Sequence, residues 1–78
     1  MLTREEEIVL KALVENYFPE ENEYIKLDTL GDEDIDANGR HIVKSLKEKG
    51  FVSKIGKQWI INYPACKITE EAINYFKN

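Results

Sequence analysis

Cysteine, histidine and long apolar stretches are scarce in this chain, and each scarcity excludes a class of protein. Cys66 is the only cysteine among 78 residues, so no disulfide can form within the chain. With His41 as the only histidine, nitrogen and sulfur ligands are too few for a tetrahedral zinc site. No apolar stretch approaches the about 18 residues that a membrane helix needs. The absence of a signal-peptide pattern and the single cysteine favour a cytoplasmic protein.

Motifs of catalysis and nucleotide binding are also missing. The chain has no GxGxxG, no Walker motif and no other glycine-rich phosphate loop. A catalytic pair of Cys66 and His41 would need a third, orienting group, and no motif supplies one. The many carboxylates lie mainly on a predicted solvated helix face and in an acidic loop. We therefore expect no enzymatic activity and no cofactor.

Positive charge is scarce in the first half of the chain, and negative charge is scarce in the second. Residues 1–36 carry three basic and twelve acidic side chains, whereas residues 37–68 carry seven basic side chains and only Glu48 as an acid. The net charge of the whole chain is −4. A length of 78 residues suits one small domain over residues 1–78. Basic residues clustered within one domain indicate binding to a polyanion.

The first third of the chain predicts a helix followed by a short strand. Thr3 and Glu6 have the spacing of a capping box, and an apolar helix then continues until Pro19 ends it. The alternation in Tyr24–Leu27 is compatible with a short strand, and Leu27–Gly31 with one helical turn.

A second helix is predicted in the middle of the chain. Asp32, Asp34 and Asp36 are all suitable N-caps, and Gly50 supplies a left-handed stop. Gly39 inside this helix costs about 1 kcal/mol relative to alanine and leaves its start undefined. The apolar stripe of this helix consists of Ile35, Ile42, Val43 and Leu46.

The last third predicts a β-hairpin and a final helix. Phe51–Ile55 and Gln58–Tyr63 have the composition of strands, with Gly56 and Lys57 as a tight turn and Pro64 ending the second strand. Thr69 then caps a helix. A hairpin alone is marginal in water, so it must pack against the helices, and the expected fold class is α+β.

The segment GRHIVKSLKEKGFVSKI resembles the recognition helix and first wing strand of winged helix-turn-helix proteins, as found in regulators of the ArsR and MarR types. Downstream, KITEEAINYFKN resembles the start of the helix that follows the wing in those proteins. Small winged-helix proteins such as the YjcQ-like family have a similar layout. The positions that carry the resemblance are His41, Ile42, Leu46, Glu48, Lys49, Gly50, Phe51, Val52, Ile68, Thr69, Ala72 and Phe76.

The resemblance implies a DNA-binding surface on the exposed face of the recognition helix. Arg40, Lys44 and Lys47 are spaced i, i+4 and i+7, and their common face lies about 130° from the apolar stripe. In a winged helix this face enters the major groove, where arginine can hold guanine and lysine can contact phosphate. The predicted site residues are Asn38, Arg40, His41, Lys44, Lys47, Lys54 and Lys57.

The remaining members of this set have individual expected roles. Asn38 can read adenine, and His41 is a packing or phosphate-contacting residue. Lys54 and Lys57 on the wing would flank the helix and contact the DNA backbone. We therefore expect a transcriptional regulator that binds double-stranded DNA, with homodimerisation through the first and last helices as a further possibility.

Other interpretations of the same residues remain open. The lysines can simply make a solvated helix face, and the fold can serve protein–protein interaction through the acidic first helix or the aromatic hairpin. Cys66 is expected as a small core residue or an exposed one. The aromatic side chains can stack on bases, although in a small hairpin such residues more often cover the core. These aromatic residues are Phe51, Trp59, Tyr63 and Tyr75.

Overall fold

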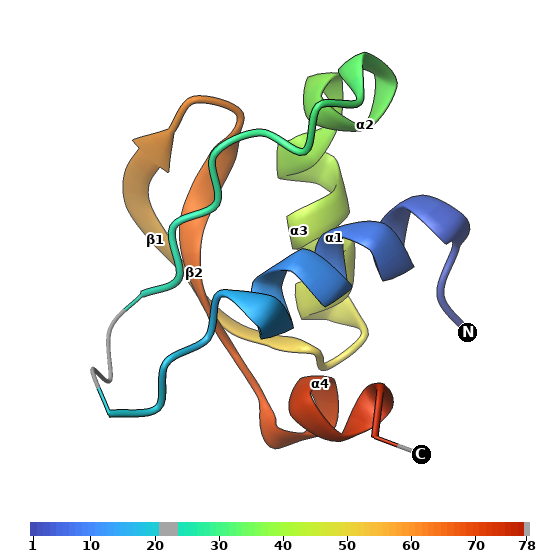
Figure 1. Cartoon of the computed structure of the whole chain (residues 1–78), viewed down its shortest axis with the longest axis vertical. Helices are drawn as coiled ribbons and strands as arrows, with labels where there is room; N and C mark the ends of the chain where they lie inside the picture. Colours follow the sequence, from blue (N-terminus) through green and yellow to red (C-terminus); the bar gives the residue numbers. More distant parts are fainter. Residues whose placement is uncertain (21–23, 78) are drawn as a thin grey trace.

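The computed structural model describes residues 1–20 and 24–77. Over these residues it contains four helices and one two-stranded antiparallel sheet (Figure 1). The elements are α1 (Arg4–Glu15), α2 (Glu33–Ala37), α3 (Gly39–Glu48), β1 (Val52–Ile60), β2 (Tyr63–Ile68) and α4 (Glu70–Tyr75). This architecture confirms the α+β class that the sequence predicts.

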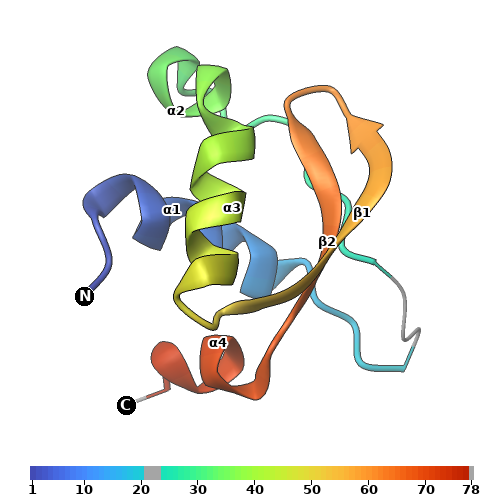
Figure 2. The same cartoon turned by 180° about the vertical axis from the view of Figure 1, so that it is seen from behind.

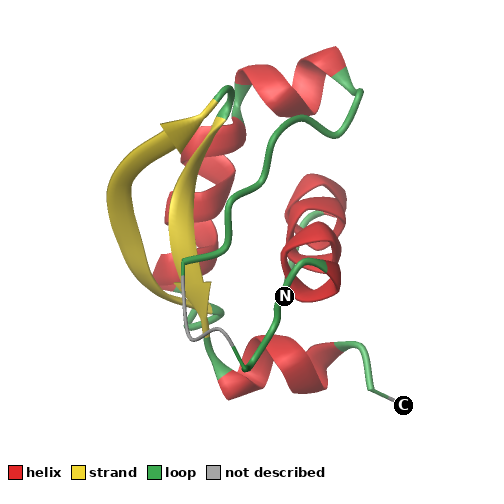
Figure 3. Ribbon diagram, turned by 60° about the vertical axis from the view of Figure 1, so that its left-hand side comes forward, coloured by secondary structure: helices red, strands yellow, loops and turns green. Residues whose placement is uncertain are grey.

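Helix α3 is the element against which most of the others pack. It contacts α1 and both strands of the hairpin, and α1 also contacts α4. Seen from behind, α3 stands beside the hairpin and α4 lies below the C-terminal end of α3 (Figure 2). Figure 3 shows the hairpin and α1 on different sides of the molecule, with the chain after α1 crossing between them. No helix of residues 1–20 and 24–77 is long and apolar enough to cross a membrane.

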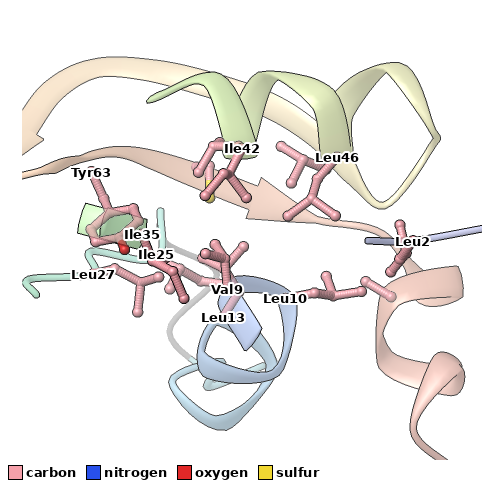
Figure 4. Close-up of a cluster of buried hydrophobic side chains, with 14 residues drawn as sticks. Leu2, Val9, Leu10, Leu13, Ile25, Leu27, Ile35, Ile42, Leu46 and Tyr63 are labelled. Carbon is pink, nitrogen blue, oxygen red and sulfur yellow. The ribbon is translucent and has the colours of Figure 1, made fainter. Parts of the chain in front are cut away.

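One apolar core lies between α1, α3 and the hairpin (Figure 4). Tyr63 of β2 is its largest fully buried side chain. Cys66 is also completely buried, so of the two predicted positions, core and surface, the core position is correct. Burial raises the pKa of its thiol to about 12. The labelled side chains that converge in Figure 4 are Leu2, Val9, Leu10, Leu13, Ile25, Leu27, Ile35, Ile42, Leu46 and Tyr63.

Helix α1 starts where the sequence predicts and ends earlier. Thr3 accepts a hydrogen bond from the Glu6 N–H at 3.2 Å, and the Thr3 N–H donates to the Glu6 carboxylate at 2.8 Å, so the capping box is confirmed. The helix does not continue to Pro19, because Asn16 caps its end with a side-chain hydrogen bond to the Ala12 carbonyl at 2.8 Å.

The segment from residue 24 to residue 31 is almost entirely irregular. Only Ile25 pairs with the sheet, through a single bridge to Cys66 with N···O distances of 2.6 and 3.0 Å, so the predicted short strand shrinks to one residue. The predicted helical turn over Leu27–Gly31 is wrong. The Leu30 N–H bonds instead to the side chain of Asp36 at 3.0 Å, which ties the end of this segment to α2.

The predicted second helix is divided in two at Asn38. Asp32 caps α2 by accepting hydrogen bonds from two N–H groups of its first turn, and Asn38 ends α2 and begins α3. Gly39 is therefore the first residue of α3 and does not interrupt a helix. A Cβ atom at Gly39 would lie 2.6 Å from the Asn62 carbonyl oxygen and 2.7 Å from the Tyr63 ring. The hairpin can pack this closely against α3 only because residue 39 lacks a side chain.

The hairpin turn predicted at Gly56 and Lys57 is wrong. β1 continues through both residues, and the chain turns at Ile61 and Asn62 instead. A Cβ atom at Gly56 would lie 3.2 Å from the Ala65 carbonyl oxygen and 3.3 Å from the Tyr24 ring. This glycine therefore permits a close approach within a strand.

The predicted second strand, Gln58–Tyr63, is accordingly wrong as well. Its first half belongs to β1, and Pro64 lies inside β2 opposite Trp59 instead of ending a strand. The pairing is irregular between Ile55 and Trp59, where the alternation of faces that sequence patterns rely on breaks down.

Glycine and threonine set the two ends of the hairpin. Gly50 has a φ of +89°, and the Phe51 N–H reaches back to the Leu46 carbonyl at 2.9 Å, which confirms the predicted left-handed stop of α3. Thr69 caps α4 as predicted, and its hydroxyl donates to the Gly50 carbonyl at 2.8 Å. The start of α4 is thereby tied to the end of α3.

Two buried carboxylates connect elements that are distant in sequence. Asp36 accepts hydrogen bonds from the Tyr63 hydroxyl at 2.7 Å and from Thr29, which joins α2 to β2 and to the irregular segment. These bonds hold the pKa of Asp36 below its usual value, with the Thr29 hydroxyl contributing most. Burial, together with the bond to Asp36, raises the pKa of Tyr63 above that of a free phenol.

Glu6 connects the start of α1 to the end of α3. Only 4% of this residue is exposed, and its carboxylate accepts hydrogen bonds from Lys49 Nζ at 2.6 Å and from the Ser45 hydroxyl. Burial alone would raise the pKa of Glu6, but the bonds from Lys49, Ser45 and Thr3 outweigh it and lower the pKa from 4.5 to about 2.

Replacing Gly39 by alanine should destabilise the fold. A Cβ atom at this position collides with the Asn62 backbone and the Tyr63 ring, so Gly39→Ala should lower the free energy of unfolding by about 2 kcal/mol in urea titrations, although alanine favours helix. Glu48→Ala on the exposed end of α3 is the control and should change it by less than about 0.5 kcal/mol. Equal stabilities of Gly39→Ala and the wild type would contradict this close packing.

Acid should remove the contribution of Glu6 selectively. The pKa of Glu6 is lower in the folded state than in the unfolded chain, so its stabilisation is complete above pH 4.5 and is lost as the pH falls toward 2. The difference in free energy of unfolding between wild type and Glu6→Gln should therefore narrow by about 2 kcal/mol over this range. Glu5→Gln, at the exposed neighbouring position, is the control. A difference that is independent of pH would show that the carboxylate is not stabilised by these bonds.

Candidate nucleic-acid interface

Helix α3 presents three basic side chains beside the hairpin. Its buried side is formed by Ile42, Val43 and Leu46, which pack into the core and fix the rotation of the helix. Arg40, Lys44 and Lys47 are exposed, as expected from their spacing relative to this apolar stripe. The packing of α3 thus determines that these three side chains share one side of the domain.

The three side chains line a groove between α3 and the hairpin. The groove has a volume of about 270 Å³. Its other side consists of apolar residues of β1 and β2 together with a glycine. The residues that line it are Arg40, Lys44, Lys47, Ile55, Gly56, Trp59 and Pro64. The lining contains no acidic residue, so this groove has positive charge along one edge and apolar surface along the other.

Arg40 and Trp59 connect the two edges of this groove. The guanidinium carbon of Arg40 lies 5.8 Å from the centre of the Trp59 ring, within the range of a cation–π interaction. Trp59 is 46% exposed, so it does not cover the core as most aromatic residues of a small hairpin do. Of the other aromatic side chains considered for base stacking, Tyr63 is in the core, Phe51 packs partly against it, and Tyr75 lies in α4.

The two lysines predicted on the hairpin do not line the groove. Lys54 pairs with Lys67 across the sheet, and cross-strand partners share a face. The adjacent residue Ile55 lines the groove, so Lys54 points to the opposite face. On that face, the Lys67 Nζ atom lies 5.0 Å from the centre of the Tyr24 ring. Lys57 is exposed within the irregular part of β1 and is not at the hairpin tip.

Asn38 and His41 belong to a different groove. This second groove, of about 510 Å³, lies between α1, α2 and α3, and it includes the acidic residues Glu5, Asp32 and Asp34. The Asn38 side chain donates a hydrogen bond to the Asp34 carbonyl at 2.9 Å. The predicted site residues are therefore separated by the structure, with the Arg40 group on one side of α3 and the pair of Asn38 and His41 on another.

His41 and Cys66 are not placed for joint chemistry. His41 is exposed on the second groove, whereas Cys66 belongs to β2 and is completely buried in the core. Among residues 1–20 and 24–77, no group of three or more histidine, cysteine, aspartate or glutamate residues is positioned to hold a metal ion.

Sequence reasoning missed the apolar half of the basic groove. The sequence patterns predict Pro64 at a strand end, Gly56 in a turn, and Trp59 in a strand where aromatic residues stack on bases or, more often, cover the core. The available signal is the absence of acidic residues from the whole of residues 49–69, which indicates one continuous basic unit from the end of α3 to the end of β2.

Comparisons with known proteins give no match to this chain, whether with protein-family models, with curated proteins or with solved structures. The geometry of the two grooves is therefore the basis on which a function is proposed.

Proposed function

We propose that this chain is a small winged-helix protein that binds double-stranded DNA and acts as a transcriptional regulator. The order of helices and hairpin is compatible with a winged helix, with α3 as the recognition helix and the β1–β2 hairpin as the wing. The observation that carries the proposal is the convergence of Arg40, Lys44 and Lys47 on a groove without acidic residues.

Charge neutralisation supports DNA as the partner of this groove. Binding to duplex DNA is dominated by cations that replace counterions on the phosphates. The one ion pair among residues 1–20 and 24–77 joins Lys49 to Glu6. The three groove cations thus keep their charge available, and the partner of Arg40 is the neutral ring of Trp59.

The distribution of acids favours one orientation of the DNA. Asp32, Glu33 and Asp34 begin α2, and the second groove beside them also contains Glu5. Phosphates would be repelled on that side, so the DNA backbone should follow the hairpin side of α3. Asn38 and His41 are therefore marginal to the proposed contact surface, and Lys54 contributes only to the surrounding potential.

A protein–protein interaction module is the alternative. The second groove is larger than the basic groove, and acidic residues from α1 and α2 line it, which fits a basic peptide segment. This partner would be independent of the charges at Arg40, Lys44 and Lys47. Homodimerisation through α1 and α4 stays a prediction.

DNA binding can be tested by fluorescence anisotropy of a labelled duplex of mixed sequence. Wild type should bind at low salt with a dissociation constant below about 100 µM, and log K against log[salt] should have a slope of about −3 because three cations contact phosphate. Exchange of Arg40 and Lys44 for glutamate should weaken binding at least about tenfold and reduce the steepness of the slope to about −1.

Lys11→Glu with Lys26→Glu is the matched control. It changes the net charge by the same amount at two exposed positions outside the groove, so it should retain most of the binding. Equal losses in the two double variants would mean that only total charge matters and that the groove is not the binding surface. Lack of binding by the wild type at low salt would exclude the proposal.

A further inference from the structure

We propose that the tip of the hairpin is an apolar wedge that enters the base stack of the bound duplex beside the basic groove. The proposal rests on the DNA-binding function above and adds how the duplex is changed on binding. Its central residue is Ile61 in the turn between β1 and β2, with Trp59 two residues before it.

The hairpin tip exposes two large apolar side chains. Ile61 is 69% exposed and Trp59 is 46% exposed. Single exposed apolar residues are common on protein surfaces, but two large ones within three residues form a local apolar projection. Neither side chain belongs to the buried core cluster.

The backbone at Ile61 is strained. Its φ of +53° lies in the left-handed region, and it is the one residue other than glycine among residues 1–20 and 24–77 with a positive φ. A β-branched residue is a clear outlier there, since glycine or asparagine occupies this region at lower cost. The next residue is asparagine, yet the left-handed position itself carries isoleucine. Backbone strain concentrates at functional sites, so we attribute this strained, exposed apolar residue to a contact with a partner.

The tip is mounted rigidly on the recognition helix. The Asn62 backbone packs against Gly39, the first residue of α3, at a distance that excludes a side chain there. Tyr63 follows directly, and its hydroxyl bonds to the buried Asp36. The turn that carries Ile61 is therefore anchored to α3 and to Asp36, which holds the Ile61 backbone in place when the surface meets a partner.

The charges of the groove beside the tip select duplex DNA as the partner of this wedge. Arg40 lies against Trp59, and Lys44 and Lys47 line the same groove, which has no acidic residue in its lining. An apolar protein surface would gain nothing from this excess of cations, whereas DNA offers phosphates next to stacked bases. Proteins that distort DNA insert isoleucine, leucine or phenylalanine side chains between base steps and bend the duplex.

The wedge can be tested with two short duplexes that differ in one central mismatch and carry 2-aminopurine beside it. Unstacking of 2-aminopurine increases its fluorescence, and anisotropy of a separate label reports binding. A mismatch lowers the cost of opening the stack, so the wild type should bind the mismatched duplex about tenfold more tightly and increase 2-aminopurine fluorescence in both.

Ile61→Asn should reduce the preference for the mismatch to less than about twofold and abolish the fluorescence increase. It should also raise the midpoint of thermal unfolding by about 4 °C, since asparagine relieves the left-handed strain. Phe18→Asn, which replaces an apolar side chain that is 59% exposed outside the hairpin, is the matched control and should behave as the wild type in both DNA assays.

The outcomes separate the two proposals. Salt-dependent binding without a change in 2-aminopurine fluorescence would overturn the wedge and leave DNA binding intact. The same fluorescence increase with Ile61→Asn as with Phe18→Asn would also overturn the wedge. Absence of binding to both duplexes at about 20 mM salt would overturn both proposals.

Discussion

The hydrogen bond between the Tyr63 hydroxyl and the Asp36 carboxylate is the contact on which the arrangement of this domain depends. It is buried, spans 27 positions of sequence and joins β2 to α2. The same carboxylate accepts bonds from the Leu30 N–H and from Thr29, so the irregular segment is fixed by it as well. Because Tyr63 must enter the core to reach Asp36, the chain has to turn immediately before it. The position of the turn then sets the register of the sheet and places Trp59 against α3.

The parts of the fold that sequence predicted correctly are those that local chemistry decides. The capping box of Thr3, the stop at Gly50 and the cap at Thr69 each depend on residues within a few positions of one another. The hairpin turn was predicted wrongly because Gly56 and Lys57 have favourable local chemistry, whereas the real turn is fixed by Gly39 and Asp36, which are distant in sequence. Residue preferences do not predict isoleucine at a left-handed turn position, so they could not locate the turn at Ile61.

In the candidate site, too, the residues placed by local spacing were predicted correctly, and those placed by packing between distant elements were not. Helical spacing was sufficient to place Arg40, Lys44 and Lys47 together, because the core side of α3 is evident from its apolar residues. Sequence could not separate Asn38 and His41 from this group, since that depends on where α2 packs against α3. It also could not place Lys54, since the face of a strand residue follows from register. Charge segregation between the acidic first half and the basic segment was visible in the sequence, whereas the apolar edge of the groove was not.

The position of Trp59 has a consequence for any spectroscopic study of this protein. Trp59 is the only tryptophan, and it lies half exposed on the groove edge instead of within the core. Its emission therefore reports the surroundings of the hairpin and of Arg40, and changes there need not accompany loss of the core. Circular dichroism of the helices would follow the core more directly. A disagreement between these two signals during denaturation would indicate that the hairpin detaches from α3 before the helices unfold.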